Sequence, residues 1–360
     1  MEPLHPPEDG AATQGAFRAP DDYSERVPVR WSVLAWTVAL AMLSSVAVVD
    51  AVAAPGRGLP AVSTQSAPGW ALDRIDQRRL PLNDTYRSRS NGEGVTAYVV
   101  DCGAQVGNPE FGGRGRRGPN FAGGPWGDCP DSFAVGHATF VAGIVGGRVT
   151  GVANAVSLVS VRALKGGEGV AAPPKRIQAQ SVIHAIDWVI SDAANSPGPA
   201  VVNLSLGFPE RFVGVSRAMQ RLERAHITAV VAAGNESGDA CQHTPARVPA
   251  ALTVGAVNRN DRRWSGTNTG PCVDLFAPGV GVRSVLRGSG VFNYRGSGAT
   301  SWATPYVTGT AALYLSAHPG ARPPAVRRWI LSGSTKGLVT GLPEHTSNSL
   351  LYAFAPLRRA

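Results

Sequence analysis

The chain has 360 residues, of which 43% are hydrophobic and 16% charged, and its formal net charge is +9. This composition excludes a chain that is disordered throughout, and it is sufficient for one large folded core. The Arg residues are scattered and no basic run is interleaved with aromatic residues, so we expect no nucleic-acid partner despite the positive charge.

The N-terminal region has the composition of a tail followed by a targeting segment. Residues 1–30 are rich in Pro, Asp, Glu and Ala without hydrophobic periodicity, which predicts a disordered tail. Residues 31–49 are apolar and uncharged, with Arg30 before them and small residues after them. This pattern predicts a signal peptide over 31–54. The run of about 19 residues is also long enough to span a bilayer, so an uncleaved membrane anchor stays open.

Export follows from either interpretation of this segment. We expect the rest of the chain to be secreted, or anchored to the outer face of the cell membrane, with membrane contact only through residues 31–49. Residues 55–68 are loose in composition and are predicted to form a linker. Residues 69–357 are predicted to form one domain, which we expect to be a monomer.

From about Gly94 onwards, short β-branched runs alternate with helical segments. Amphipathic spacing predicts helices over residues 181–194 and 215–225. Strands separated by such helices need crossover connections, which predicts an α/β fold with an open, mostly parallel sheet and helices on both faces. In such sheets binding sites gather at the C-terminal ends of the strands. The predicted buried strands are residues 95–101, 156–164, 200–207, 227–234 and 251–257.

Three polar residues stand at predicted strand ends or helix starts. Asp101 closes the first strand, His137 opens an apolar helical run, and Ser301 precedes another. A serine hydroxyl is a poor nucleophile until an imidazole accepts its proton, and the imidazole needs a carboxylate to fix its tautomer. Each residue alone has an ordinary explanation as a turn, structural or capping residue. Their order along the chain, however, is the order found in subtilisin.

Six blocks in order along the chain carry a resemblance to a known family: residues 70–78, 98–103, 136–139, 201–207, 231–235 and 301–305. With these blocks, residues 64–354 resemble the subtilisin-like serine peptidases, and most closely the proteinase K and aqualysin branch. The resemblance implies a three-layer subtilisin-like fold. It also implies a secreted endopeptidase that cleaves polypeptides through an acyl-enzyme and needs no cofactor for catalysis.

The resemblance implies further roles for residues near Ser301. The Asn235 amide would help to hold the oxyanion beside the Ser301 N–H, although an ordinary turn residue after Gly234 is the alternative. A second group of residues would wall the pocket for the side chain before the scissile bond, and a third would offer a strand edge to an extended peptide. The pocket residues are Leu206, Gly207, Ala232, Ala233 and Gly234, and the edge residues are Gly166, Gly167 and Gly169.

The sequence departs from the family pattern close to the expected catalytic residues. Ala138 and Phe140 replace a Gly and a second His of the family's histidine block, while Ala299 and Trp302 replace a Gly and a Met of its serine block. Added side chains at positions of close backbone approach can displace reacting groups. A catalytically inactive or weak peptide-binding protein with the same fold therefore stays open as an alternative function.

Cysteines and a calcium site complete the expectations. Four cysteines in an exported chain allow three pairings, and none has zinc-site spacing. The resemblance implies a disulfide between Cys241 and Cys272, whereas a bridge between Cys102 and Cys129 is a hypothesis based only on their positions near Asp101 and His137. The resemblance also implies a structural calcium ion bound by Pro249, Ala251 and Asp274, the alternative being that Asp274 caps or pairs locally.

Overall fold

The computed structural model describes residues 62–126, 136–165, 175–288, 290–293 and 298–357. All of them belong to one compact unit, Gly56–Ala360. The expected tail and the expected signal or anchor segment lie outside the described residues. Within the described part of the chain, no helix is both long and apolar enough to cross a membrane.

The end of the expected linker is ordered as a strand. Residues Ser63–Ser66 form β1, which pairs antiparallel with β2 (Thr85–Ser88). Helix α1 (Trp70–Ile75) lies between these two strands in the chain, and its Ala71, Leu72 and Ile75 side chains are buried in the core. Residues 63–66 of the expected linker thus form a strand, because pairing with β2 orders a sequence that has no hydrophobic run of its own.

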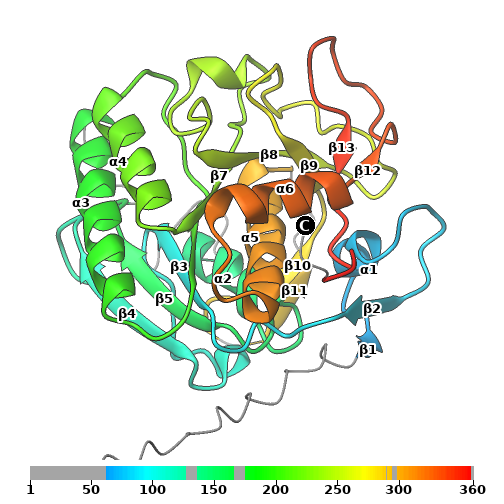
Figure 1. Cartoon of the computed structure of the whole chain (residues 1–360), viewed down its shortest axis with the longest axis horizontal. Coiled ribbons are helices and arrows are strands. Elements are labelled where there is room, and N and C mark those ends of the chain that lie inside the picture. Colours follow the sequence, from blue (N-terminus) through cyan, green and yellow to red (C-terminus); the bar gives the residue numbers. More distant parts are fainter. Residues whose placement is uncertain (1–61, 127–135, 166–174, 289, 294–297, 358–360) are drawn as a thin grey trace, which may run out of the picture. The chain divides into compact units, whose positions relative to one another are not determined.

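The main sheet of the described chain has nine strands, and all neighbouring pairs are parallel except β12 with β13 (Figure 1). The five predicted strands form its centre, which confirms the α/β class. Their order across the sheet is β12 (Thr335–Lys336), β13 (Ser349–Leu350), β9 (Leu275–Pro278), β8 (Ala251–Val257), β7 (Thr228–Ala232), β6 (Ala200–Leu204), β3 (Thr96–Asp101), β5 (Ser157–Arg162) and β4 (Gly115–Asn120).

Helices cover both faces of this sheet, and α3 and α4 lie side by side in Figure 1. Alternate strand residues serve the two layers: Val99 belongs to one buried cluster, and Val100 to the other. The helices on the Val99 side are α2 (His137–Gly146), α5 (Thr300–Ala317) and α6 (Pro323–Gly333), and those on the Val100 side are α3 (Lys175–Ala194) and α4 (Val213–Arg224).

Short elements complete the fold. A separate hairpin pairs β10 (Arg283–Val285) with β11 (Val291–Asn293), and two 3₁₀ turns span Pro109–Phe111 and Ala240–Gln242. Helix α3 begins six residues before the predicted residue 181, because the polar segment at its start carries no apolar periodicity. Strands of two to four residues give no pattern that can be distinguished from a loop.

Three of the four cysteines are described, and all three are disulfide-bonded. Cys241 and Cys272 form the disulfide that the resemblance implies, with their Cα atoms 5.3 Å apart. Cys102 is also disulfide-bonded. Its expected partner, Cys129, lies outside the described residues, so that pairing stays a prediction.

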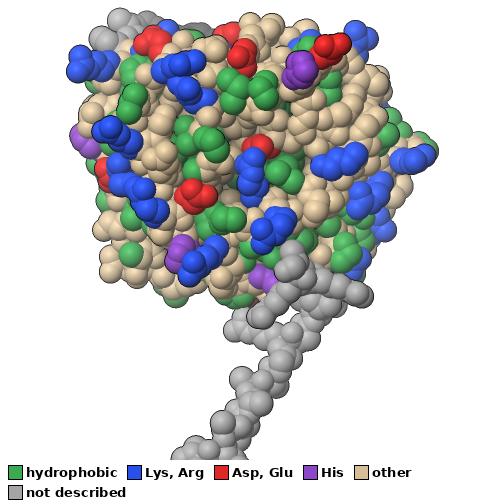
Figure 2. All heavy atoms as spheres, turned by 45° about the horizontal axis from the view of Figure 1, so that its top comes forward, with side chains coloured by type: hydrophobic (Ala, Val, Ile, Leu, Met, Phe, Trp, Pro, Cys, Tyr) green, Lys and Arg blue, Asp and Glu red, His purple; other side chains and the backbone are tan. Residues whose placement is uncertain are grey.

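On the face shown in Figure 2, Lys and Arg side chains are spread among uncharged and hydrophobic ones.

A buried ion pair fastens α1 to the turn after β8. The Arg74 side chain is fully buried and donates from Nε and Nη2 to the two carboxylate oxygens of Asp261, at 2.7 and 2.9 Å. Its Nη1 donates to the Gln77 carbonyl at 2.7 Å, so the guanidinium has partners on each side. Each of the two charged groups is stabilised by the other, because burial removes most of the water that would otherwise solvate it.

We expect Arg74→Met to lower the free energy of unfolding by about 3–5 kcal/mol, because the change leaves Asp261 buried without its partner. Denaturant unfolding measures the loss. Arg224→Met, at an exposed position of α4, is the matched control and should change stability little. Equal stabilities for the two variants would show that the pair does not fasten α1.

Candidate active site

The candidate site lies where the order of the sheet reverses. Strand β3 is central, β5 lies on one side of it and β6, the next strand along the chain, lies on the other. Ligands of parallel sheets bind beyond the carboxyl ends of the strands at such a reversal. Asp101 is the last residue of β3 and is fully buried, so its carboxylate is placed at that point by the sheet itself.

Asp101 holds the ring of His137, the first residue of α2. The Nδ1 atom of His137 is 3.0 Å from each Asp101 carboxylate oxygen, and the Cys102 N–H donates to Oδ1 at 2.8 Å. An ionised carboxylate can only accept hydrogen bonds, so the proton of the neutral imidazole lies on Nδ1. The Nε2 atom is then the basic nitrogen, and the His137 side chain is 21% exposed.

Ser301 is the second residue of α5, where backbone N–H groups have no partner within the helix. Its side chain and backbone are both bonded to Ser205, which follows β6. The Ser301 hydroxyl donates to the Ser205 carbonyl at 3.0 Å, and the Ser205 hydroxyl donates to the Ser301 carbonyl at 2.9 Å. Two reciprocal hydrogen bonds thus join the loop after β6 to the start of α5.

Pro305 explains why the Ser301 carbonyl accepts from Ser205. In a helix this carbonyl would accept the N–H of the residue four positions on, but Pro305 has no N–H. The sequence analysis did not identify Ser205, although a proline four residues after Ser301 is a signal for an unpaired carbonyl at Ser301. Asn203 donates to Ser205 Oγ at 2.9 Å and accepts from Thr308 at 2.9 Å, so the contact is supported from behind.

Asn235 is fixed by Thr300, the residue before Ser301. Its Oδ1 atom accepts from the Thr300 N–H at 2.9 Å and from the Thr300 hydroxyl at 2.8 Å. Because a backbone N–H can only donate, the bonded atom must be the amide oxygen, and the amide NH₂ is directed elsewhere. The residue is exposed. Its NH₂ is therefore available to an oxygen of a bound molecule, and Thr300 is a second functional residue that sequence reasoning missed.

The departures from the family pattern fit together in the structure. The Trp302 ring packs on the His137 ring with centroids 4.9 Å apart, and on the Phe140 ring at 4.7 Å. The two replacements therefore form one aromatic contact behind the imidazole. Ala299 has φ −151° and ψ 143°, an extended conformation that any residue adopts, so no glycine is needed there. Ala138 is fully buried in α2.

The residues expected to wall a substrate pocket gather at one edge. Strands β6 and β7 are neighbours, so the segments that follow them lie side by side. Leu206 and Ala232 are buried and Gly207 is exposed. Gly234 has φ 103°, and a Cβ there would lie 2.2 Å from Asn268 Nδ2, so only glycine fits. Gly166, Gly167 and Gly169 lie outside the described residues.

The residues expected to bind calcium do not fit that ion as they stand. Both carboxylate oxygens of Asp274 and the carbonyl of Ala251 accept hydrogen bonds from the guanidinium of Arg327. Asp274 thus forms a local ion pair with Arg327, which was the alternative to binding calcium. Asp101, Cys102 and His137 also lie close enough to share a metal ion, but the disulfide-bonded Cys102 has no thiolate to offer.

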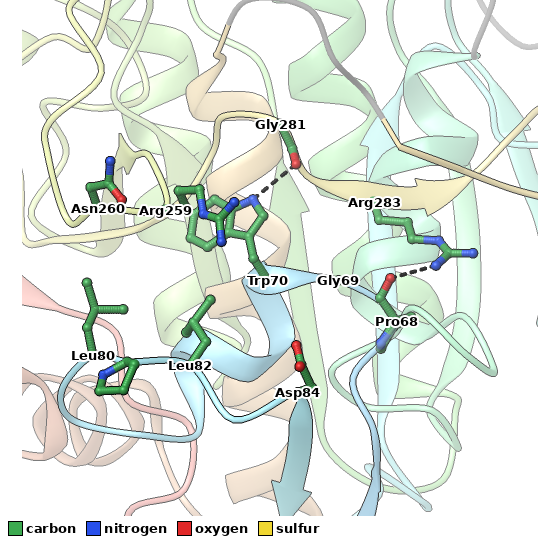
Figure 3. Close-up of a pocket in the computed structure, with 11 residues that line it drawn as sticks. Pro68, Gly69, Trp70, Leu80, Leu82, Asp84, Arg259, Asn260, Gly281 and Arg283 are labelled. Atoms are coloured by element: carbon green, nitrogen blue, oxygen red, sulfur yellow. Dashed lines mark hydrogen bonds between the residues drawn. The ribbon is translucent and has the colours of Figure 1, made fainter.

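A separate hollow of about 790 Å³ lies between residues 68–84 and the loops after β8 and β9 (Figure 3). Trp70 forms one wall, with its indole N–H donating to the Gly281 carbonyl at 3.0 Å, and Arg259 and Arg283 add positive charge. No serine, cysteine or histidine lines it. The hollow therefore lacks the groups for acyl transfer, and the chemistry belongs at the end of β3.

Comparisons with known proteins place this fold among the subtilisin-like serine proteases. An extracellular serine proteinase of Thermus sp. (strain Rt41A) is 43% identical over 295 residues, covering 81% of this chain and 68% of the relative. The alkaline serine exoprotease A of Vibrio alginolyticus is 42% identical over 285 residues, covering 79% of this chain and 50% of the relative. This chain thus spans only half of the Vibrio protein.

The fold is likewise that of a solved relative. The crystal structure of a cold adapted subtilisin-like serine proteinase is 39% identical, with a TM-score of 0.71, and covers 81% of this chain and 100% of that chain. Residues 92–349 match the Subtilase family. The chain belongs to the subtilase family, a family of serine endopeptidases, and its relatives confirm the proteinase K and aqualysin branch.

We expect Ser205→Ala to reduce kcat/KM for a peptide substrate by about 10-fold, because the start of α5 loses one of its two bonds and small displacements of reacting groups are costly. It should also lower the free energy of unfolding by about 1–3 kcal/mol, since the buried Ser301 carbonyl loses its partner. The control is Ser216→Ala. The Ser216 hydroxyl donates to the carbonyl of Phe212, the N-cap residue of the same helix, α4. Unchanged kinetics in Ser205→Ala would contradict this role.

Proposed function

We propose that this protein hydrolyses peptide bonds through an acyl-enzyme, with Ser301 as nucleophile, His137 as general base and Asp101 as the carboxylate that orients it. The observation that carries the proposal is the position of the His137 ring. The ring is bonded to Asp101 on one side and packed against Trp302, the residue after Ser301, on another. Family membership favours this activity over an inactive peptide-binding protein.

In the first half of the reaction, Ser301 Oγ turns from the Ser205 carbonyl towards His137 and attacks the carbonyl carbon of the scissile bond. The hydroxyl proton passes to His137 Nε2, and Asp101 stabilises the imidazolium through Nδ1–H. Negative charge develops on the substrate oxygen, where the Asn235 NH₂ and the Ser301 N–H donate hydrogen bonds. The start of α5 adds the favourable end of a helix dipole.

In the second half, the C–N bond breaks and His137 returns the proton to the departing amine. A water molecule, deprotonated by His137, then attacks the acyl carbon. The C–O bond to Ser301 breaks as His137 returns that proton to Ser301 Oγ, and the acid is released. Electrons and protons balance without an oxidant, a reductant or a metal. We therefore assign no cofactor to catalysis, and no calcium ion to Pro249, Ala251 and Asp274 while Arg327 is present.

The proposed substrates are polypeptides in extended form. Leu206, Gly207 and the segment 232–234 would wall the pocket for the side chain before the scissile bond, and their small or apolar side chains favour an apolar or aromatic one. Gly166, Gly167 and Gly169 complete the proposal as a strand edge for the peptide backbone.

The proposed setting is outside the cell. The name of the Thermus relative describes an extracellular proteinase, and residues 31–54 have the sequence of a signal peptide. An anchor at residues 31–49 would keep the enzyme on the outer face of the membrane instead. We propose that the folded domain works as a monomer in either setting.

We expect Ser301→Ala and His137→Ala each to reduce kcat on the order of 10⁶-fold, the scale known for subtilisin itself, and the double variant to lose little more. The two losses of kcat are not expected to multiply, because Ser301 and His137 act together and removing either one disables the other. The measurement is steady-state cleavage of a chromogenic peptide by purified protein of verified fold. Near-normal turnover in His137→Ala, or single losses that multiply in the double variant, would contradict the proposal.

A further inference from the structure

Arg327 on α6 donates to three oxygen atoms, one on the first residue of β8 and two on the residue just before β9. Its Nη1 donates to the carbonyl of Ala251, the first residue of β8, at 2.6 Å and to Asp274 Oδ2 at 2.9 Å. Its Nη2 donates to Asp274 Oδ1, just before β9. One guanidinium therefore joins α6, β8 and β9.

The Asp274 carboxylate is tightly enclosed. Its side chain is 14% exposed, and Oδ2 also accepts the Thr253 N–H at 2.9 Å. Burial raises the pKa of this carboxyl, while the charge of Arg327 is the strongest influence that lowers it. Among the described residues, the hydrogen bonds to this carboxylate thus come from the Arg327 guanidinium and from a backbone N–H.

The oxygen atoms that Arg327 binds are of the kind that a calcium ion prefers, namely a carboxylate and a backbone carbonyl. They include two of the three residues that the resemblance implies as calcium ligands. The third, Pro249, lines a hollow of about 60 Å³ together with Ala251, Arg327 and Glu223. A divalent ion entering this hollow would meet a guanidinium that is always charged.

We propose that the Arg327 guanidinium is a built-in cation that takes the place of a calcium ion at this site. The link between α6, β8 and β9 is then independent of dissolved calcium. Removal of the guanidinium exposes an oxygen-rich site that binds a divalent cation, with the Asp274 carboxylate and the Ala251 and Pro249 carbonyls as ligands and water filling the rest. This proposal concerns stability and does not rest on the catalytic roles.

The test compares thermal unfolding midpoints of the full protein in EDTA and in millimolar calcium, with a serine protease inhibitor present to prevent self-digestion. The variants are Arg327→Met, which keeps much of the side-chain volume, and the double variant Arg327→Met with Asp274→Asn. Arg328→Met, at the exposed neighbouring position of α6, is the matched control. Asp274→Asn alone completes the set.

In EDTA we expect Arg327→Met to unfold about 5 °C below the wild type, and Arg328→Met to unfold near it. Calcium should raise the midpoint of Arg327→Met more than that of the wild type, and the double variant should lose this extra response. Calcium effects from other sites cancel in the comparison, since all variants share them.

Two results would overturn the proposal. One is a calcium response of the wild type that Asp274→Asn removes, which would show that calcium binds at Asp274 beside Arg327. The other is an Arg327→Met variant that responds to calcium no more than the wild type, which would show that the guanidinium does not occupy a cation site.

Discussion

The start of α5 is held in place by the two hydrogen bonds between Ser205 and Ser301, and the candidate catalytic groups depend on that position. Pro305 frees the Ser301 carbonyl, and Ser205 uses it. Because α5 is buried along Thr300 to Leu315, its first turn cannot shift without disturbing the core. Thr300 then fixes Asn235, and Trp302 meets His137. Three adjacent residues, Thr300, Ser301 and Trp302, thus connect the candidate nucleophile to the proposed oxyanion donor and the proposed base.

The aromatic contact behind His137 shows how a family pattern can change without loss of its geometry. Phe140 and Trp302 replace two residues of the family blocks, and each is buried against the other. An aromatic face within about 6 Å of a cation attracts it, so the Trp302 ring would also favour the imidazolium of the proposed mechanism. The same contact limits rotation of the His137 ring away from Asp101.

The guanidinium groups of Arg327 and Arg74 have the same structural role, which is to join a helix to the main sheet or to a turn beside it. Arg74 ties α1 to the turn after β8, and Arg327 ties α6 to the start of the same strand. Each donates to both oxygens of one carboxylate and to a backbone carbonyl. This geometry suits the planar fork of arginine, and the ammonium group of lysine could not reproduce it.

Much of the fold and the candidate catalytic residues could be predicted from the sequence, because buried strands and helix starts leave local patterns. Asp101 closes a β-branched run and His137 opens an apolar one, so their positions follow from neighbours in the chain. Ser205, Thr300 and Arg327 could not be predicted in this way. Their roles depend on partners 96, 65 and 53 residues away, respectively, which only the folded chain brings together.

The short strands β12 and β13 were missed for a related reason. Two residues in a strand make no hydrophobic alternation. Their pairing depends on the folded sheet, in which β13 pairs with β9 and β12 pairs with β13. The segment expected to offer a strand edge to an extended substrate lies outside the described residues, so sequence remains the basis for the roles of Gly166, Gly167 and Gly169.

The central claim is that Ser301 is a nucleophile activated by His137, and covalent labelling tests it most directly. A fluorophosphonate reacts with activated serines, so we expect one adduct on folded protein, mapped by peptide mass spectrometry to Ser301. Labelling should be lost in His137→Ala, which lacks the base that accepts the Ser301 proton. Folded, wild-type protein that takes up no label at Ser301 would contradict the account.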